Sequence, residues 1–146
     1  MSDIGKFSFI FLAIIFSTSC KESISIDGSK SSDEPIIGIT WKLASIDTIN
    51  GGVQAIYSGQ EYTLLIKEDS TASGRSHCNL YEARVRLGNG TITFFDLAET
   101  EMWCRPPSLD GEYIHALLAA SHYRVSGQKL KIFYNNQQNV LNFTGE

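Results

Sequence analysis

The sequence has few of the residues on which a functional assignment usually depends. It contains only three prolines and three cysteines, and 12 Lys and Arg against 16 Asp and Glu give a formal net charge of -4. A mildly acidic chain without a basic run is a poor candidate for binding nucleic acid, because affinity for phosphates comes largely from Lys and Arg. We therefore expect no nucleic acid among its partners.

The sequence also lacks the short motifs of common enzyme chemistry. The nucleophile elbow, the His-Glu-x-x-His zinc motif, the Gly-x-Gly-x-x-Gly fingerprint, the phosphate-binding loop and the EF-hand are all absent. Of the three histidines, His77 adjoins a cysteine and His115 falls on the polar side of an expected helix. His122 follows the end of that helix, where a cation suits the dipole and caps the chain. We expect a chain that is not an enzyme and binds no cofactor.

A strongly apolar run lies near the N-terminus. Residues 7–16 are apolar apart from one serine. This run is too short to cross a hydrocarbon core of about 30 Å as a helix, but it has the length of a secretory signal's apolar region. Small residues at 17–19 precede Cys20 and resemble the lipobox of bacterial lipoproteins, although Ser17 replaces the usual Leu. The resemblance implies cleavage before Cys20 and lipidation of that cysteine; an ordinary signal with a free Cys20 is the alternative.

The residues that follow Cys20 predict where the protein resides. Lys21, rather than Asp, comes next, and by resemblance to Gram-negative sorting rules this favours the outer membrane of the bacterial cell envelope. Residues 20–36 are rich in Ser and charge, which predicts a flexible tether that spans on the order of 23 Å. The expected organisation is a signal peptide at 1–19, the tether at 20–36 and a folded monomeric domain at 37–146, with the membrane bound through lipidated Cys20.

The folded part has the pattern of an antiparallel sheet with one helix. Apolar and charged residues alternate along 79–87, which indicates a strand with one buried face. A helix is expected at 109–121, with Ser108 as its N-cap. Its apolar face would hold Leu109, Tyr113, Leu117 and Ala120, with Ile114 and Leu118 beside them. The other expected strands are 39–47, 53–57, 61–67, 71–75, 91–96, 123–125, 129–134 and 139–143. The fold class is therefore α+β: a partly open, barrel-like antiparallel sheet with one packed helix.

Two further cysteines remain once Cys20 is set aside. Cys78 and Cys104 form an even pair in an exported domain, which favours a disulfide. Such a bond would close a loop of about 27 residues and contribute about 3.5 kcal/mol in the chain-entropy model. The alternative is a soft-metal site that combines both thiolates with His77, although the tight Cys-x-x-Cys spacing of many metal sites is absent.

Several short motifs are spread over the folded part of the sequence. They are Trp41-x-Leu43, Gly74-x-x-x-Cys78-Asn79-x-Tyr81, Thr100-Glu101-Met102-Trp103-Cys104, Glu112 and Leu117 in the helix, and the segment 123–133. Together these elements resemble the META/HslJ domain family over about residues 41–143. At two places the sequence departs from the family: His77 and the pair Glu82-Ala83 stand where glycines are usual. The resemblance implies a small exported or lipid-anchored domain with a cysteine pair and no known catalytic residues.

Three functions stay open at this stage. The first is a lipid-anchored envelope protein whose domain is a non-enzymatic interaction or envelope-stress module with an unknown protein partner. The second is a carrier that holds a lipid or other apolar ligand between sheet and helix, although aromatic residues in a small β domain are more often core. The third is a thiol or metal enzyme that uses Cys78, Cys104 and His77. The aromatic residues considered for a ligand groove are Trp41, Phe94, Phe95 and Trp103.

Overall fold

The computed structural model describes residues 35–146. The predicted signal peptide, the lipidation of Cys20 and almost all of the tether lie outside the described residues. None of the helices in the described part is long and apolar enough to cross a membrane.

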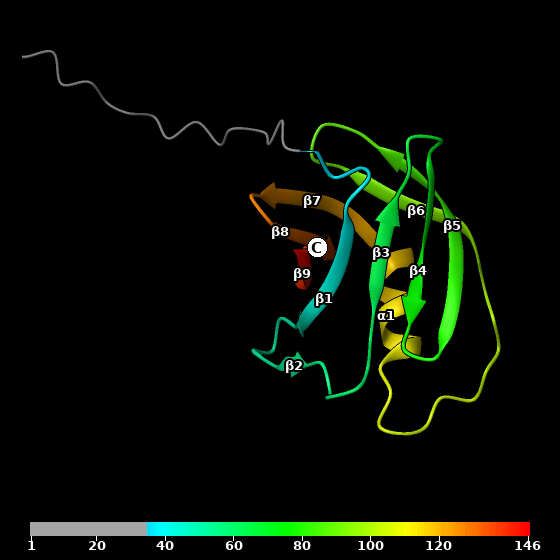
Figure 1. The fold of residues 1–146 in the computed structure, drawn as a ribbon. Coiled ribbons are helices and arrows are strands. Elements are labelled where there is room, and N and C mark those ends of the chain that lie inside the picture. The colour runs from blue at the N-terminus through cyan, green and yellow to red at the C-terminus, as the bar shows by residue number, and fades with distance from the viewer. Residues whose placement is uncertain (1–34) are drawn as a thin grey trace, which may run out of the picture.

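A single nine-stranded antiparallel sheet makes up most of the domain and curls into a half-barrel around one helix (Figure 1). The strand order is β6-β5-β4-β3-β1-β9-β8-β7, with β2 paired to one end of β1. This architecture confirms the α+β class expected from the sequence. The elements are β1 (Thr40–Asp47), β2 (Val53–Ala55), β3 (Thr63–Ile66), β4 (Thr71–Ser76), β5 (Asn79–Leu87), β6 (Ile92–Glu99), α1 (Asp110–Leu118), β7 (Ala120–Ser126), β8 (Lys129–Tyr134) and β9 (Asn139–Gly145).

The two edges of the sheet approach each other without forming a full ladder. Thr91 and His122 form an isolated bridge, and the Tyr123 amide donates to the carbonyl of Gly90 at 2.9 Å. The helix α1 lies on the concave side, behind β3 and β4 in Figure 1, and it contacts β6 and β4. The half-barrel is therefore held together by a bridge between its edges and by a helix packed inside it.

The helix is shorter than the sequence predicts. Its N-cap residue is Leu109, and the predicted cap Ser108 instead donates its hydroxyl to the Asp110 carboxylate at 2.7 Å. The helix stops at Leu118 because the chain from Ala120 pairs with β8 as strand β7. The capping role predicted for His122 is wrong for the same reason, since His122 is a strand residue opposite Phe133.

The buried face of the helix also differs from the predicted face in two positions, Ala116 and Leu118. Tyr113, Ile114, Ala116 and Leu117 are buried, whereas Leu118 is 48% exposed. The exposure predicted for His115 is confirmed. On β5 the alternation is as predicted, with Tyr81, Ala83 and Val85 on the buried face.

Large side chains fill the space between sheet and helix. The Tyr113 ring meets three other aromatic rings at centroid distances of 5.3 Å (Tyr62), 5.9 Å (Tyr81) and 6.3 Å (Phe143), each in an edge-on arrangement. Trp41 is fully buried beside this cluster of tyrosines, and its indole N–H donates to the carbonyl of Ile36 at 3.0 Å. The core is therefore aromatic and closely packed.

A polar cluster sits inside this aromatic core. The hydroxyls of Tyr81 and Tyr113 lie 2.8 and 3.0 Å from the carbonyl oxygen of Thr63, and 3.0 Å from each other. Burial raises the pKa of both tyrosines above the ordinary value, so both remain protonated donors near neutral pH. These hydroxyls satisfy a backbone acceptor inside the barrel, where leaving it without a partner would be unfavourable.

Gly74 is required by the same cluster. A Cβ atom at this position would lie 1.9 Å from the Thr63 carbonyl oxygen and 2.8 Å from the Tyr81 hydroxyl. Neither contact is sterically possible, so only glycine allows β4 to pass this close to β3. The first glycine of the Gly74-x-x-x-Cys78 motif thus has a packing role.

Replacing Gly74 by alanine should destabilise the domain strongly. We expect Gly74→Ala to lower the free energy of unfolding by about 3 kcal/mol or more, because the new methyl group collides with backbone. Gly111→Ala is the matched control, since nothing lies within 4 Å of its Cβ position in α1; it should gain about 0.5 kcal/mol from helix propensity. Urea unfolding of both variants measures the difference, and equal effects would contradict the steric role of Gly74.

Candidate functional site: a loop anchored by a disulfide

A disulfide joins the turn between β4 and β5 to the long loop that follows β6. It links Cys78 to Cys104, with Cα atoms 5.5 Å apart. The structure therefore contains the bond favoured by the sequence, and neither sulfur is left as a free thiolate. Within residues 35–146, no group of three or more His, Cys, Asp and Glu side chains is arranged to hold a metal ion.

The turn before Cys78 keeps its shape without the glycine usual in the family. His77 has a φ of 57°, in the left-handed region that favours glycine but that His also adopts at times. Its amide donates to the carbonyl of Glu61 at 2.8 Å, and its ring stacks on Tyr62 at a centroid distance of 6.2 Å. His77 is thus a turn residue that contacts the core.

The second departure from the family falls opposite a bulge. The register between β5 and β6 shifts between Glu82 and Arg84. On the partner strand, Asp96 takes a φ of 51°. The irregular backbone at this level therefore lies on β6, while Glu82 and Ala83 keep regular strand alternation.

The side chain of Asn79 anchors the loop beside the disulfide. Its amide oxygen accepts from the Met102 backbone N–H at 2.8 Å and from the Thr100 hydroxyl at 2.9 Å. Its amide nitrogen donates to the Met102 carbonyl at 3.3 Å and contacts the Cys104 sulfur at 3.6 Å. Asn79 is only 4% exposed, so one buried amide uses both its ends to fix the backbone of residues 100–104.

The anchored loop presents large apolar side chains to solvent. Trp103 is 79% exposed, Met102 61% and the neighbouring Leu80 54%. Leu80 is tied to the same loop, because the Thr100 amide donates to its carbonyl at 3.0 Å. We call Leu80, Met102 and Trp103 the disulfide patch.

The aromatic residues considered for a ligand groove are thus separated by the fold. Trp41 and Phe94 are core residues, as expected. Phe95 lies on the outer face of β6, where the guanidinium of Arg86 sits 5.4 Å from its ring centre. The prediction of a core position is wrong for Trp103, because the bonds of Asn79 to Met102 and the disulfide hold this part of the loop outside the barrel.

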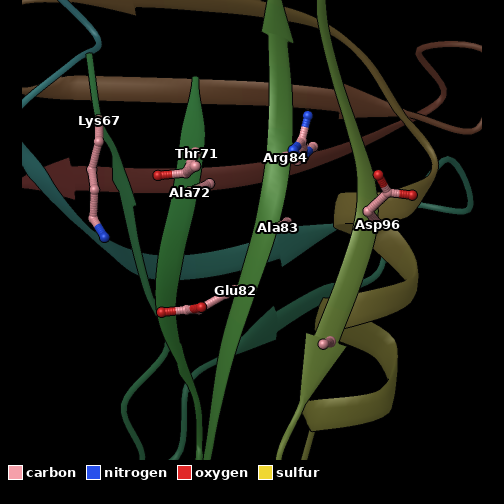
Figure 2. Close-up of a pocket in the computed structure, with 8 residues that line it drawn as sticks. Lys67, Thr71, Ala72, Glu82, Ala83, Arg84 and Asp96 are labelled. Carbon is pink, nitrogen blue, oxygen red and sulfur yellow. The ribbon is translucent and has the colours of Figure 1, made fainter. Parts of the chain in front are cut away.

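Two shallow hollows lie on the outside of the sheet, one of them beside the patch, and no residue of α1 lines either of them. One, of about 310 Å³, is lined by residues of β5 and β6 that include Leu80, Glu82 and Ala98. The other, of about 270 Å³, is shown in Figure 2, with Lys67, Glu82, Arg84 and Asp96 around it. Both hollows have charged linings and open to solvent, unlike an enclosed apolar ligand site.

The family comparison agrees with the motif residues placed above. The model of the META domain matches residues 34–146. The chain belongs to the META domain family. Comparison with curated proteins finds no match.

Solved structures support the fold of this META domain. A protein from Burkholderia xenovorans studied by NMR is 24% identical, with a TM-score of 0.65, and the match covers 75% of this chain and 83% of that one. A second protein solved by NMR is 22% identical, with a TM-score of 0.56 and coverage of 73% and 87%. A DUF4847 family protein from Bacteroides vulgatus is 14% identical, with a TM-score of 0.53 and coverage of 72% and 90%. At these identities the likeness shows the fold alone.

The META motif residues have distinct structural tasks. Gly74 and Tyr81 belong to the buried polar cluster, and Cys78, Asn79 and Cys104 fix the loop. Sequence reasoning paired the cysteines but missed the role of Asn79. The sequence did contain an indication of this role. Asn79 falls on the side of an alternating strand that is predicted to be buried, and a buried polar side chain needs hydrogen-bond partners.

Removing the Asn79 side chain should destabilise the domain even with the disulfide intact. We expect Asn79→Ala to lower the free energy of unfolding by about 2–3 kcal/mol, because the Met102 amide and carbonyl lose their partners. Asn50→Ala, at an exposed turn residue, is the control and should change stability by less than about 0.5 kcal/mol. Urea unfolding without reductant makes the comparison; a loss no larger than that of the control would refute the anchoring role.

Proposed function

We propose that the chain is a lipid-anchored protein of the bacterial cell envelope, whose META domain is a non-enzymatic interaction or envelope-stress module. The observation that carries this proposal is the disulfide patch. Trp103 and Met102 are exposed, yet their backbone is fixed by a covalent bond and by the buried Asn79 amide. A rigid loop loses little conformational entropy when it binds, and exposed Trp is a frequent centre of protein interfaces.

The residues that could perform chemistry have structural tasks instead. Cys78 and Cys104 are bonded to each other, and His77 occupies a turn. In the described residues every buried side-chain nitrogen or oxygen has a hydrogen-bond partner. These contacts support a binding role over a thiol or metal enzyme, because polar groups poised for catalysis are often left with perturbed or incomplete partners.

A carrier of an apolar ligand receives less support. That function needs room between the sheet and α1, and the fully buried Trp41, Tyr62, Tyr113 and Leu117 occupy this space. The two hollows described above lie outside this space and open to solvent. We therefore prefer an interaction module that binds a protein.

The membrane anchor has its own test. We expect the mature protein, extracted from its native membrane, to begin at Cys20 and to carry the added mass of acyl chains. Cys20→Ser should leave the domain folded but release it from the membrane fraction, because the anchor supplies about 0.8 kcal/mol for each buried methylene. Intact-mass spectrometry and fractionation measure both effects. Recovery of Cys20→Ser in the membrane fraction, in the same amount as the parent, would contradict the anchor.

The interaction surface can be tested in living cells. With a photo-crosslinking amino acid in place of Met102, we expect an adduct to a discrete partner protein. The same residue at Leu118, which is exposed elsewhere on the domain, is the control and should give none. Replacing the neighbouring aromatic residue, as Trp103→Ser, should lower the adduct yield by about tenfold, as for a central interface residue. Adducts of equal yield from both crosslinker positions, or none at all, would count against the proposal.

A further inference from the structure

Large exposed apolar side chains gather at one end of the half-barrel. Because neighbouring strands are antiparallel, the C-terminal ends of β1 and β4 meet the N-terminal ends of β3 and β5 at this end. The loop after β6 and the hairpin of β2 lie there too, at the bottom of Figure 1. We call this the disulfide end. Its exposed apolar side chains are Ile49, Val53, Tyr57, Leu80, Met102 and Trp103.

The described chain begins at the opposite end. Ile37 forms a bridge to Ile66 at the close of β3, whereas Tyr62, before the start of β3, bridges Ser76. Pro35 therefore enters beside the end of the sheet that lies away from the disulfide, at the top of Figure 1. The first described residues therefore lie away from the disulfide end.

Hydrogen bonds connect two loops at the disulfide end. The side-chain amide of Gln60 donates to the carbonyl of Pro107, and the Leu109 amide donates to the Tyr62 hydroxyl at 2.8 Å. These bonds tie the segment before β3 to the segment before α1.

Carboxylates surround the disulfide patch. Glu99 and Glu101 flank it on the loop side, and Glu82 follows Leu80 on the same face of β5. Within residues 35–146 none of these three belongs to an ion pair, whereas Glu61 is neutralised by Arg75 at 3.6 Å. Arg84, which follows Glu82 on the same face of β5, and Arg105, which follows Cys104, are nearby cations that also lie outside such a pair in this part of the chain. The patch is therefore apolar at its centre, and three carboxylates against two cations leave its surroundings slightly negative.

We propose, on the basis of the interaction function argued above, that the disulfide end binds a segment of a partner protein that combines apolar side chains with Lys or Arg. The apolar side chains would cover Trp103 and Met102, and the cations would meet Glu99 and Glu101. Charge of opposite sign steers such a segment to the patch and excludes acidic competitors.

Other occupants suit the patch less well. An anionic bilayer would be repelled by its carboxylates. A second copy of the chain, docked patch to patch, would bring like charges together, which is destabilising. The charges therefore favour a cationic protein segment over both.

The test uses the full-length lipidated chain in intact cells, with the photo-crosslinker at Met102. Glu101→Lys reverses a charge at the patch, and Glu68→Lys makes the same change of net charge at an exposed turn of the other end. We expect Glu101→Lys to lower the adduct yield by about fivefold and Glu68→Lys to leave it unchanged. Mass spectrometry of the adduct should find a partner peptide that contains apolar residues together with Lys or Arg.

The outcomes separate this inference from the proposed function. A partner peptide that is neutral or acidic, or equal yields from the two charge reversals, overturns the cationic partner while the interaction module stands. An adduct to lipid, or to a second copy of the chain, overturns the inferred partner in favour of that occupant. The absence of any adduct, with both variants folded as judged by their unfolding temperatures, overturns the inference and the interaction module together.

Discussion

The carbonyl oxygen of Thr63 imposes the main constraint on the interior of this domain. It points into the barrel, where two tyrosine hydroxyls supply the hydrogen bonds that water would otherwise provide. Tyr81 comes from β5 and Tyr113 from α1, so hydrogen bonds to the Thr63 carbonyl connect a strand of the sheet and the helix to one acceptor. Gly74 is the consequence on β4, because only a residue without a side chain leaves room for this meeting. In a low-dielectric interior such a cluster is stabilising only when all its members are satisfied.

A second system works independently at the rim of the barrel. There a covalent bond and one buried amide hold a loop that contributes little to the core. The tyrosine cluster stabilises the core, whereas the disulfide and Asn79 hold the loop after β6 in place.

The sequence predicted those features that depend on local pattern. Alternation of apolar and charged residues predicted β5 within its true bounds. The cysteine pair followed from composition. The helix was predicted too long because the pairing of Ala120 with Tyr134 replaces helical bonds, and that contact joins segments far apart in the chain. Trp103 was misplaced for a similar reason: its hydrophobicity favours the core, whereas the bonds between Asn79 and Met102 fix it outside.

The contrast between the two tryptophans has a practical consequence. Trp41 is fully buried in the aromatic core, and Trp103 is 79% exposed on the anchored loop; they are the only tryptophans in the chain. The protein therefore contains two tryptophan fluorophores in different environments. Emission from Trp41 reports whether the barrel is intact, and quenching of Trp103 by acrylamide reports whether the loop is covered. Unfolding and occupancy can thus be followed in one unlabelled sample.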